Sequence, residues 1–199
     1  PQNGYALFAL VRAGEVYMQL EQLPGWLARL DEIAAEAPAG AALIPWAKAG
    51  VLMRAGQGAE AAQLLGTRSV TGLPDNAAGY ALALRAGVQN ANGQHSTAAA
   101  TASEAIARCS EAGLGLDEAL FQLARALYLQ KQWQAAEEVY QRLLDECVIA
   151  NAEVNALALL DRAQALYELG ETANVVKLCD DALRLRPRFA LAARAVLLK

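Results

Sequence analysis

The chain has 199 residues, of which 55% are hydrophobic, 6% aromatic and 19% charged, and its net charge is −4. It is too apolar for intrinsic disorder, it has no apolar run near the roughly 18 residues of a membrane helix, and it lacks the basic balance typical of nucleic-acid-binding domains. Alanine supplies about a quarter of the residues, which favours closely packed helices. We therefore expect an all-α fold.

The first four residues include no initiator Met and no basic or apolar segment of a signal peptide. We expect the chain to be a piece excised from a longer protein, and nothing in it decides between the cytoplasm and the periplasm. Cys109, Cys147 and Cys179 form no CxxC pair, so neither a zinc site nor a disulfide framework is expected. They are expected to fill helix interfaces as small buried side chains.

Five units follow one another, and in each a small residue stands four positions after a large apolar one. The small residues recur at spacings of 36, 36, 38 and 39. They are Gly14, Gly50, Ala86, Ala124 and Ala163, preceded by Leu10, Trp46, Leu82, Leu120 and Leu159. Apolar spacings of three and four indicate a helix, a short turn and a second helix in each unit. The expected units lie near residues 7–40, 43–76, 79–112, 117–150 and 156–189.

Prolines and glycines mark the ends of the second helices in the first units. Pro38 and Pro74 fall near the ends of the first and second units, where a proline stops a helix. Gly66 and Gly72, together with Pro74, predict that the second unit has a short second helix followed by a loop around residues 67–76.

The fourth and fifth units show the helix-turn-helix pattern most clearly. In the fourth, a helix from Leu120 is followed by a turn at Lys131 and Gln132 and by a second helix over 133–144. In the fifth, Gly170 predicts the break between the two helices. Pro187 ends this unit, and we expect a last helix over 188–199 to cap the array.

This pattern resembles the tetratricopeptide repeat, a 34-residue helix-turn-helix unit with large and small residues at fixed places. The second-helix alanine of that family is matched by Ala62, Ala98 and Ala136, and the aromatic residue after it by Tyr140. The departures are Trp26 and Val175 in place of that alanine, and Arg85 and Arg162 in place of a buried aliphatic residue. The resemblance implies a right-handed α-solenoid of about five degenerate repeats over residues 1–199, in which each unit contacts only its neighbours.

In this family the first helix of each repeat lines a concave surface that takes the partner. Carried over to this sequence, the resemblance places the following residues there: Phe8, Glu15, Met18, Arg54, Tyr80, Asn90, Glu118, Phe121, Arg125, Tyr128, Gln164 and Tyr167. Phe121, Arg125 and Tyr128 share one helical face, as an anchor cluster for a peptide would. The alternative is that these rings pack within a tight superhelix. Val11 and Glu15 stand where chaperone-tail-binding relatives need a Lys and an Asn, so binding of a C-terminal carboxylate in that manner is not expected.

No pattern indicates catalysis, and we expect neither an enzyme nor a metal or cofactor. His95, the only histidine, is expected at a surface turn, and residues 56–58 are interpreted as a turn rather than a phosphate loop. The pairs Glu137–Glu138 and Asp180–Asp181 point about 100° apart on a helix, which predicts solvated charges rather than an acid–base dyad. The arginines near the C-terminus are interpreted as complementing a helix macrodipole. They are Arg184, Arg186, Arg188 and Arg194.

Two functions remain open at this point. The first is a non-enzymatic scaffold that binds a segment of another protein in its concave groove, one form being part of a bacterial envelope or polysaccharide-export complex. The alternative is an effector-sensing domain of a larger transcription regulator, which repeats of 36 to 39 residues resemble. For this domain we expect no nucleic acid and no membrane insertion, and the oligomeric state stays open.

Overall fold

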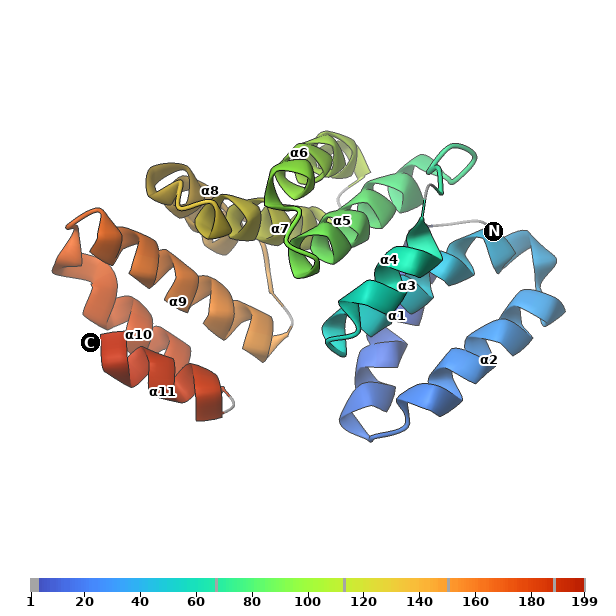
Figure 1. The fold of residues 1–199 in the computed structure, drawn as a ribbon, viewed down its shortest axis with the longest axis horizontal. Coiled ribbons are helices and arrows are strands. Elements are labelled where there is room, and N and C mark those ends of the chain that lie inside the picture. The colour runs from blue at the N-terminus through green and yellow to red at the C-terminus, as the bar shows by residue number, and fades with distance from the viewer. Residues whose placement is uncertain (1–3, 67, 113, 150, 188, 199) are drawn as a thin grey trace. The chain divides into compact units, whose positions relative to one another are not determined.

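The computed structural model describes residues 4–66, 68–112, 114–149, 151–187 and 189–198. Within these residues the chain consists of eleven α-helices and two short 3-10 helices, with no strand (Figure 1). The expected all-α, repeat-like architecture is therefore confirmed. None of the helices in this part of the chain combines the length and apolarity needed to cross a bilayer.

The helices fall into two compact units, the first extending to Ala119 and the second starting at Leu120. The first unit holds α1 (Gly4–Gln19), α2 (Leu23–Glu36), η1 (Pro38–Leu43), α3 (Ile44–Arg54), α4 (Gly58–Leu65), α5 (Asp75–Ala91), α6 (His95–Ala112) and the start of α7 (Leu116–Leu129). The second holds the rest of α7, α8 (Trp133–Glu146), α9 (Ala152–Glu168), η2 (Thr172–Asn174), α10 (Val175–Arg184) and α11 (Phe189–Leu198). A single domain over residues 1–199 stays a prediction.

The repeated small residues lie where first helices cross. A Cβ added to Gly14 would stand 2.3 Å from Cγ2 of Val51, and one added to Gly50 would stand 3.0 Å from Cδ2 of Leu84. These two close approaches allow α1 to pack on α3 and α3 on α5. The equivalent Ala86, Ala124 and Ala163 are completely buried. The sequence periodicity therefore marks a genuine packing position, because only a small side chain fits at such a crossing.

A turn of the same kind joins the two helices in each of the five repeats. The second residue after the first helix has a left-handed backbone in every case: Glu21, Gly56, Gly93, Lys131 and Gly170. The next residue donates its N–H five positions back, over 2.8 to 3.0 Å, in the pairs Gln22–Tyr17, Gln57–Leu52, Gln94–Gln89, Gln132–Leu127 and Glu171–Leu166. This is the Schellman arrangement that ends a helix. The predicted turns at 131–132 and at Gly170 are confirmed.

Most of the expected boundaries match, and the differences are local. The short second helix that was expected for the second repeat, residues 43–76, is confirmed, since α4 ends at Leu65. The following loop ends at Pro74 rather than at residue 76, because this proline precedes the first helical residue and α5 starts directly after it. Residue 67 of the expected loop lies outside the described residues. In the fourth repeat, expected over residues 117–150, the first helix begins at Leu116, four residues before the expected Leu120.

Candidate functional site

Charged side chains from α1, α3 and α7 meet in the first unit and form what we call the inner cluster: Arg12, Glu15, Arg54, Asp117 and Glu118. Arg54 lies at its centre. Its Nε is 2.7 Å from Oε1 of Glu15, its Nη2 pairs with Glu118, and its Nη1 donates to the carbonyl of Gly50 over 3.1 Å. Arg12 Nη1 donates to Oε2 of Glu15 over 2.9 Å, and its Nη2 lies 3.8 Å from Oδ2 of Asp117.

Two aromatic rings border the inner cluster. The rings of Phe8 and Tyr80 lie with centroids 5.6 Å apart, and the guanidinium of Arg12 lies 5.0 Å from the centroid of Phe8. Burial raises the pKa of the Tyr80 hydroxyl above its ordinary value. Burial, followed by the like charge of Glu118, also raises the pKa of the Asp117 carboxyl. The inner cluster is thus an ordered polar centre in a largely apolar surrounding.

Five residues expected at the concave surface belong to this region or border it: Phe8, Glu15, Arg54, Tyr80 and Glu118. The structure brings them together, and the three charged ones, Glu15, Arg54 and Glu118, form ion pairs with one another. The side chains of Glu15, Arg54 and Glu118 are only 10, 12 and 13% exposed. Consistent with this, α1 packs on α5 as well as on α3. Each repeat was expected to contact only its neighbours. This prediction is wrong within the first unit, because inward side chains from non-adjacent repeats contact one another there.

A second cluster surrounds Asp161 in the second unit, and we call it the Asp161 cluster: Arg125, Tyr128, Tyr140, Asp161 and Arg194. The Asp161 side chain is 1% exposed. Its Oδ2 accepts from Arg125 over 2.9 Å and from the Tyr140 hydroxyl over 3.0 Å. Its Oδ1 accepts from Arg194 over 2.5 Å. Helices α7, α8, α9 and α11 each contribute to this one carboxylate, which therefore joins two repeats to the last helix.

The outer side of the Asp161 cluster keeps polar groups accessible. Arg125 and Arg194 are 32 and 29% exposed. Arg194 also donates to the Tyr128 hydroxyl over 3.1 Å, and the Tyr128 ring meets Trp133 edge-on with centroids 5.4 Å apart. Burial raises the pKa of Tyr128, so it stays a neutral phenol at neutral pH. Two guanidinium groups share one buried carboxylate, so these three groups together carry a net charge of one positive unit.

The other expected surface residues are distributed between buried and open positions. Asn90 and Phe121 are buried, and Met18 is partly buried. Gln164 donates to Glu168 over 2.9 Å, and the Tyr167 side chain next to this pair is 53% exposed. Among the expected surface residues, Arg125, Tyr128, Gln164 and Tyr167 of the second unit are at least partly exposed, whereas Phe121 of the same unit is buried.

Several sequence interpretations need correction. Glu137 is not a solvated charge: it is buried, and its Oε1 lies 2.8 Å from Nη2 of Arg162. Arg194 does not complement a helix terminus, because it pairs with Asp161. His95 is the first residue of α6 and is partly buried, with Nδ1 3.4 Å from Oδ1 of Asn90. Residue 188 of the arginine group lies outside the described residues.

The residues that the sequence analysis missed are mostly ion-pair partners. Arg12, Asp117, Asp161 and Arg194 carry no motif of their own. One signal was available: Arg125 and Asp161 carry opposite charges on successive first helices and are 36 residues apart, close to the spacing of 39 between the small residues Ala124 and Ala163 of these helices. A search for opposite charges near the repeat spacing would have found this pair.

The cysteines behave as small core residues in two of three cases. Cys109 and Cys179 are buried, whereas Cys147 is partly exposed. Burial, followed by the charge of Asp117, raises the pKa of the Cys109 thiol to about 11, so this thiol stays protonated at neutral pH. Within the described ranges, no group of three or more His, Cys, Asp or Glu side chains is placed to hold a metal ion.

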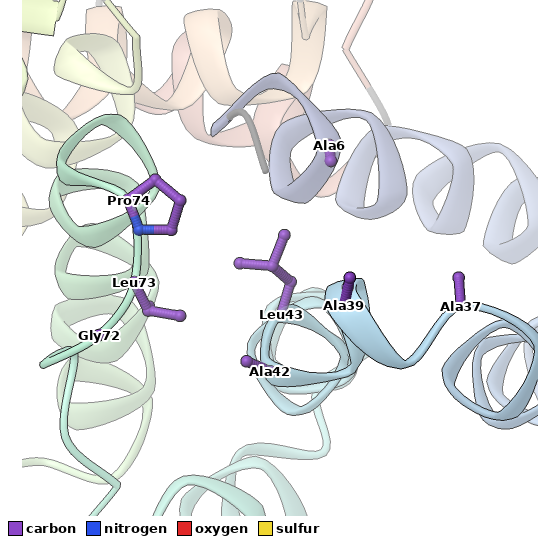
Figure 2. A pocket seen from close by; sticks show the side chains of 9 residues that line it. Ala6, Ala37, Ala39, Ala42, Leu43, Gly72, Leu73 and Pro74 are labelled. Atoms are coloured by element: carbon purple, nitrogen blue, oxygen red, sulfur yellow. The ribbon is translucent and has the colours of Figure 1, made fainter. Parts of the chain in front are cut away.

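An apolar pocket of about 250 Å³ lies in the first unit, and none of its lining residues belongs to the inner cluster (Figure 2). It is formed by Ala6 of α1, by the segment from Ala37 to Leu43 and by the turn at residues 72–74. No residue that lines it was singled out for binding from the sequence.

Comparison of the chain with models of protein families gave no match, and comparison with curated protein sequences gave none.

Proposed function

We propose that this chain is a non-enzymatic protein-interaction module of the tetratricopeptide-like kind, and that it binds a segment of a partner protein at the exposed side of the Asp161 cluster. The observation that supports this most directly is the pair of arginines on one buried carboxylate. Arg125 and Arg194 share Asp161, and each remains about a third exposed beside the Tyr128 phenol.

Charge favours a partner segment that carries a carboxylate. A guanidinium has five N–H donors, and within the described residues Arg125 gives one of them to Asp161. A carboxylate from the partner would use remaining donors and neutralise the excess charge of the pair. Glu168, held by Gln164 at the edge of this region, would disfavour a second negative charge there. The partner is therefore expected to present an isolated acidic side chain rather than an acidic run.

The order of the cluster lowers the cost of binding. Asp161 and Tyr140 are buried, the Tyr140 hydroxyl donates to Asp161, and Asp161 in turn holds both guanidinium groups before any partner arrives. Side chains that are already fixed lose little conformational entropy when they bind. Tyr167 lies on the same helix as Asp161 and is 53% exposed, so it would give a partner that extends along α9 an additional aromatic contact.

A photo-cross-linking residue at position 167 tests the proposal in native cells. The partner identified by mass spectrometry is then purified, and its affinity is measured for the unmodified chain and for Arg125→Ala/Tyr128→Ala. We expect the double variant to lose at least about tenfold in affinity, and we expect binding to the unmodified chain to weaken with salt. Tyr5→Ala is the matched control, since Tyr5 is an exposed aromatic residue of the first unit.

Two outcomes would contradict the proposal. One is an unchanged affinity in the double variant, and the other is an equal loss in the Tyr5→Ala control. Because Arg125 also holds Asp161, each variant is first compared with the unmodified chain by circular dichroism. Arg125→Lys, which keeps the charge but not the paired donors, serves if the double variant does not fold.

A further inference from the structure

The apolar pocket arises where two repeats depart from the regular pattern. After α2, the chain does not turn directly into α3 but passes through η1 (Pro38–Leu43). After the short α4, the described residues 66 and 68–74 precede the start of α5. Figure 2 shows side chains from these two segments and Ala6 of α1 around one space. The lining side chains are small, so they leave this space unfilled.

The chemistry of the wall excludes a charged occupant. All the residues that line the pocket are alanine, glycine, leucine or proline, so no side chain there can donate or accept a hydrogen bond. Several of the nearby backbone N–H groups are already used: those of Ala37, Gly40 and Leu73 donate to the carbonyls of Ile33, Ala37 and Val70 over 2.9 to 3.0 Å. Water in such a space finds few partners and is readily displaced by an apolar group.

The volume of the pocket limits the number of atoms in its occupant. A water molecule takes about 30 Å³ of liquid volume, so a pocket of about 250 Å³ has room for roughly eight to ten heavy atoms. A single aromatic ring with a short substituent or an alkyl chain of similar length meets this limit.

The limited volume of the pocket favours a free small molecule over a partner's segment. A segment that inserts one side chain also covers the apolar surface around the pocket. Among the exposed large hydrophobic side chains in the described part of the chain, Tyr5 is the one that neighbours a lining residue in sequence.

We propose that this pocket is a binding site for a small, uncharged, apolar molecule of about eight to ten heavy atoms. The site belongs to the first unit and uses no residue of the Asp161 cluster. It therefore stands independently of partner binding, and either proposal can fail without the other.

Toluene is the probe, and the methyl resonances of Leu43 and Leu73 report where it binds. We expect saturable shifts of these methyl groups in the full chain and a rise in melting temperature. Benzoate, which adds a charge to the same ring, is expected to bind at least about tenfold more weakly because no group in the wall can stabilise the charge.

Two alanine-to-leucine changes in α1 form the matched pair. Ala6→Leu places extra methyl groups into the pocket, and we expect it to weaken toluene binding at least about tenfold. Ala9→Leu changes an exposed position of the same helix and is expected to bind toluene like the unmodified chain. If Ala6→Leu does not fold, Leu73→Asn, which places an amide in the wall, is expected to weaken binding similarly.

The proposal is overturned if toluene causes no saturable shift of the Leu43 and Leu73 methyl groups, or if the pocket variant and the Ala9→Leu control bind it alike. Binding of benzoate as tight as that of toluene would also overturn it. Equal or tighter binding of N-acetylphenylalanine amide would instead assign the pocket to a partner's side chain.

Discussion

Asp161 shows how a single buried carboxylate can organise a helical repeat. Removing a carboxylate from water costs several kcal/mol unless charged partners and hydrogen bonds replace the water. Here two guanidinium groups and the Tyr140 hydroxyl supply those contacts. Burial, followed by the charge of Asp161, raises the pKa of Tyr140 well above its ordinary value, so this hydroxyl keeps the proton that it donates.

We predict that Asp161→Ala lowers the free energy of unfolding by about 2–4 kcal/mol. This is less than for a completely buried ion pair, because the two arginines are about a third exposed and can regain water. Asp181→Ala, which removes a carboxylate paired with the exposed Arg184, is expected to cost less than about 1 kcal/mol. Urea unfolding of the two variants measures the difference, and similar losses in both would show that Asp161 has no special role.

At the scale of the element, the five Schellman turns are the most regular feature of the repeat. Three of the five left-handed positions carry glycine, whereas Glu21 and Lys131 adopt the same conformation with a side chain. A glutamine or glutamate follows in every unit, and its N–H closes the turn. The structure thus reveals a repeat signature, a left-handed residue followed by Gln or Glu, that the search for large and small residues did not find.

Gly25 and Gly93 allow the effect of backbone conformation on stability to be distinguished from that of steric clash. A Cβ at Gly93 or at Gly25 would meet no atom within 4 Å, but only Gly93 has a positive φ, of 76°. We predict that Gly93→Ala lowers the free energy of unfolding by about 1–2 kcal/mol, since an L-residue is strained there. Gly25→Ala, within α2, is expected to raise it by about 0.5–1 kcal/mol. Thermal or urea unfolding gives both signs, and a loss in Gly25→Ala equal to that in Gly93→Ala would contradict the conformational explanation.

At the scale of the whole molecule, the chain consists of two compact units, and each unit consists of helix pairs of the same kind. In the second unit, α11 packs on α9 and α10, and Arg194 pairs with Asp161 of α9. In a stack of repeats, stability comes mainly from interfaces between neighbours, so a change at the last helix should act close to it.

We predict that Arg194→Ala speeds amide hydrogen exchange in α11 and in the facing part of α9 and leaves exchange in α1–α4 unchanged. The physical reason is that the variant removes an ion pair between these two helices, which lowers the cost of opening the last one. Arg184→Ala is the control, because its side chain is 79% exposed and pairs only with Asp181 of its own helix within the described residues. Uniformly faster exchange over the whole chain would mean that the units open together and that local opening is not the mechanism.

The helices, most of their boundaries and the small residues at the crossings could be predicted from the sequence. These features depend on local chemistry: apolar spacing, glycine and proline. The burial of the charged side chains could not. Glu137 and Arg162 are 25 residues apart, and Arg194 and Asp161 are 33 apart. Which of many charges meet at such separations depends on how the helices pack, so Glu137 and Arg194 both looked like surface groups.

The sequence by itself determined an all-helical chain of repeated helix pairs, because the periods of its apolar and small residues are those of packed helices. Only the tertiary structure decided that the charged inward residues of the first unit pair with one another, that Asp161 binds two arginines, and that an apolar pocket opens where the repeat is irregular. These features depend on contacts between side chains far apart in the chain, and the free energy of such contacts is defined only once the helices are in place.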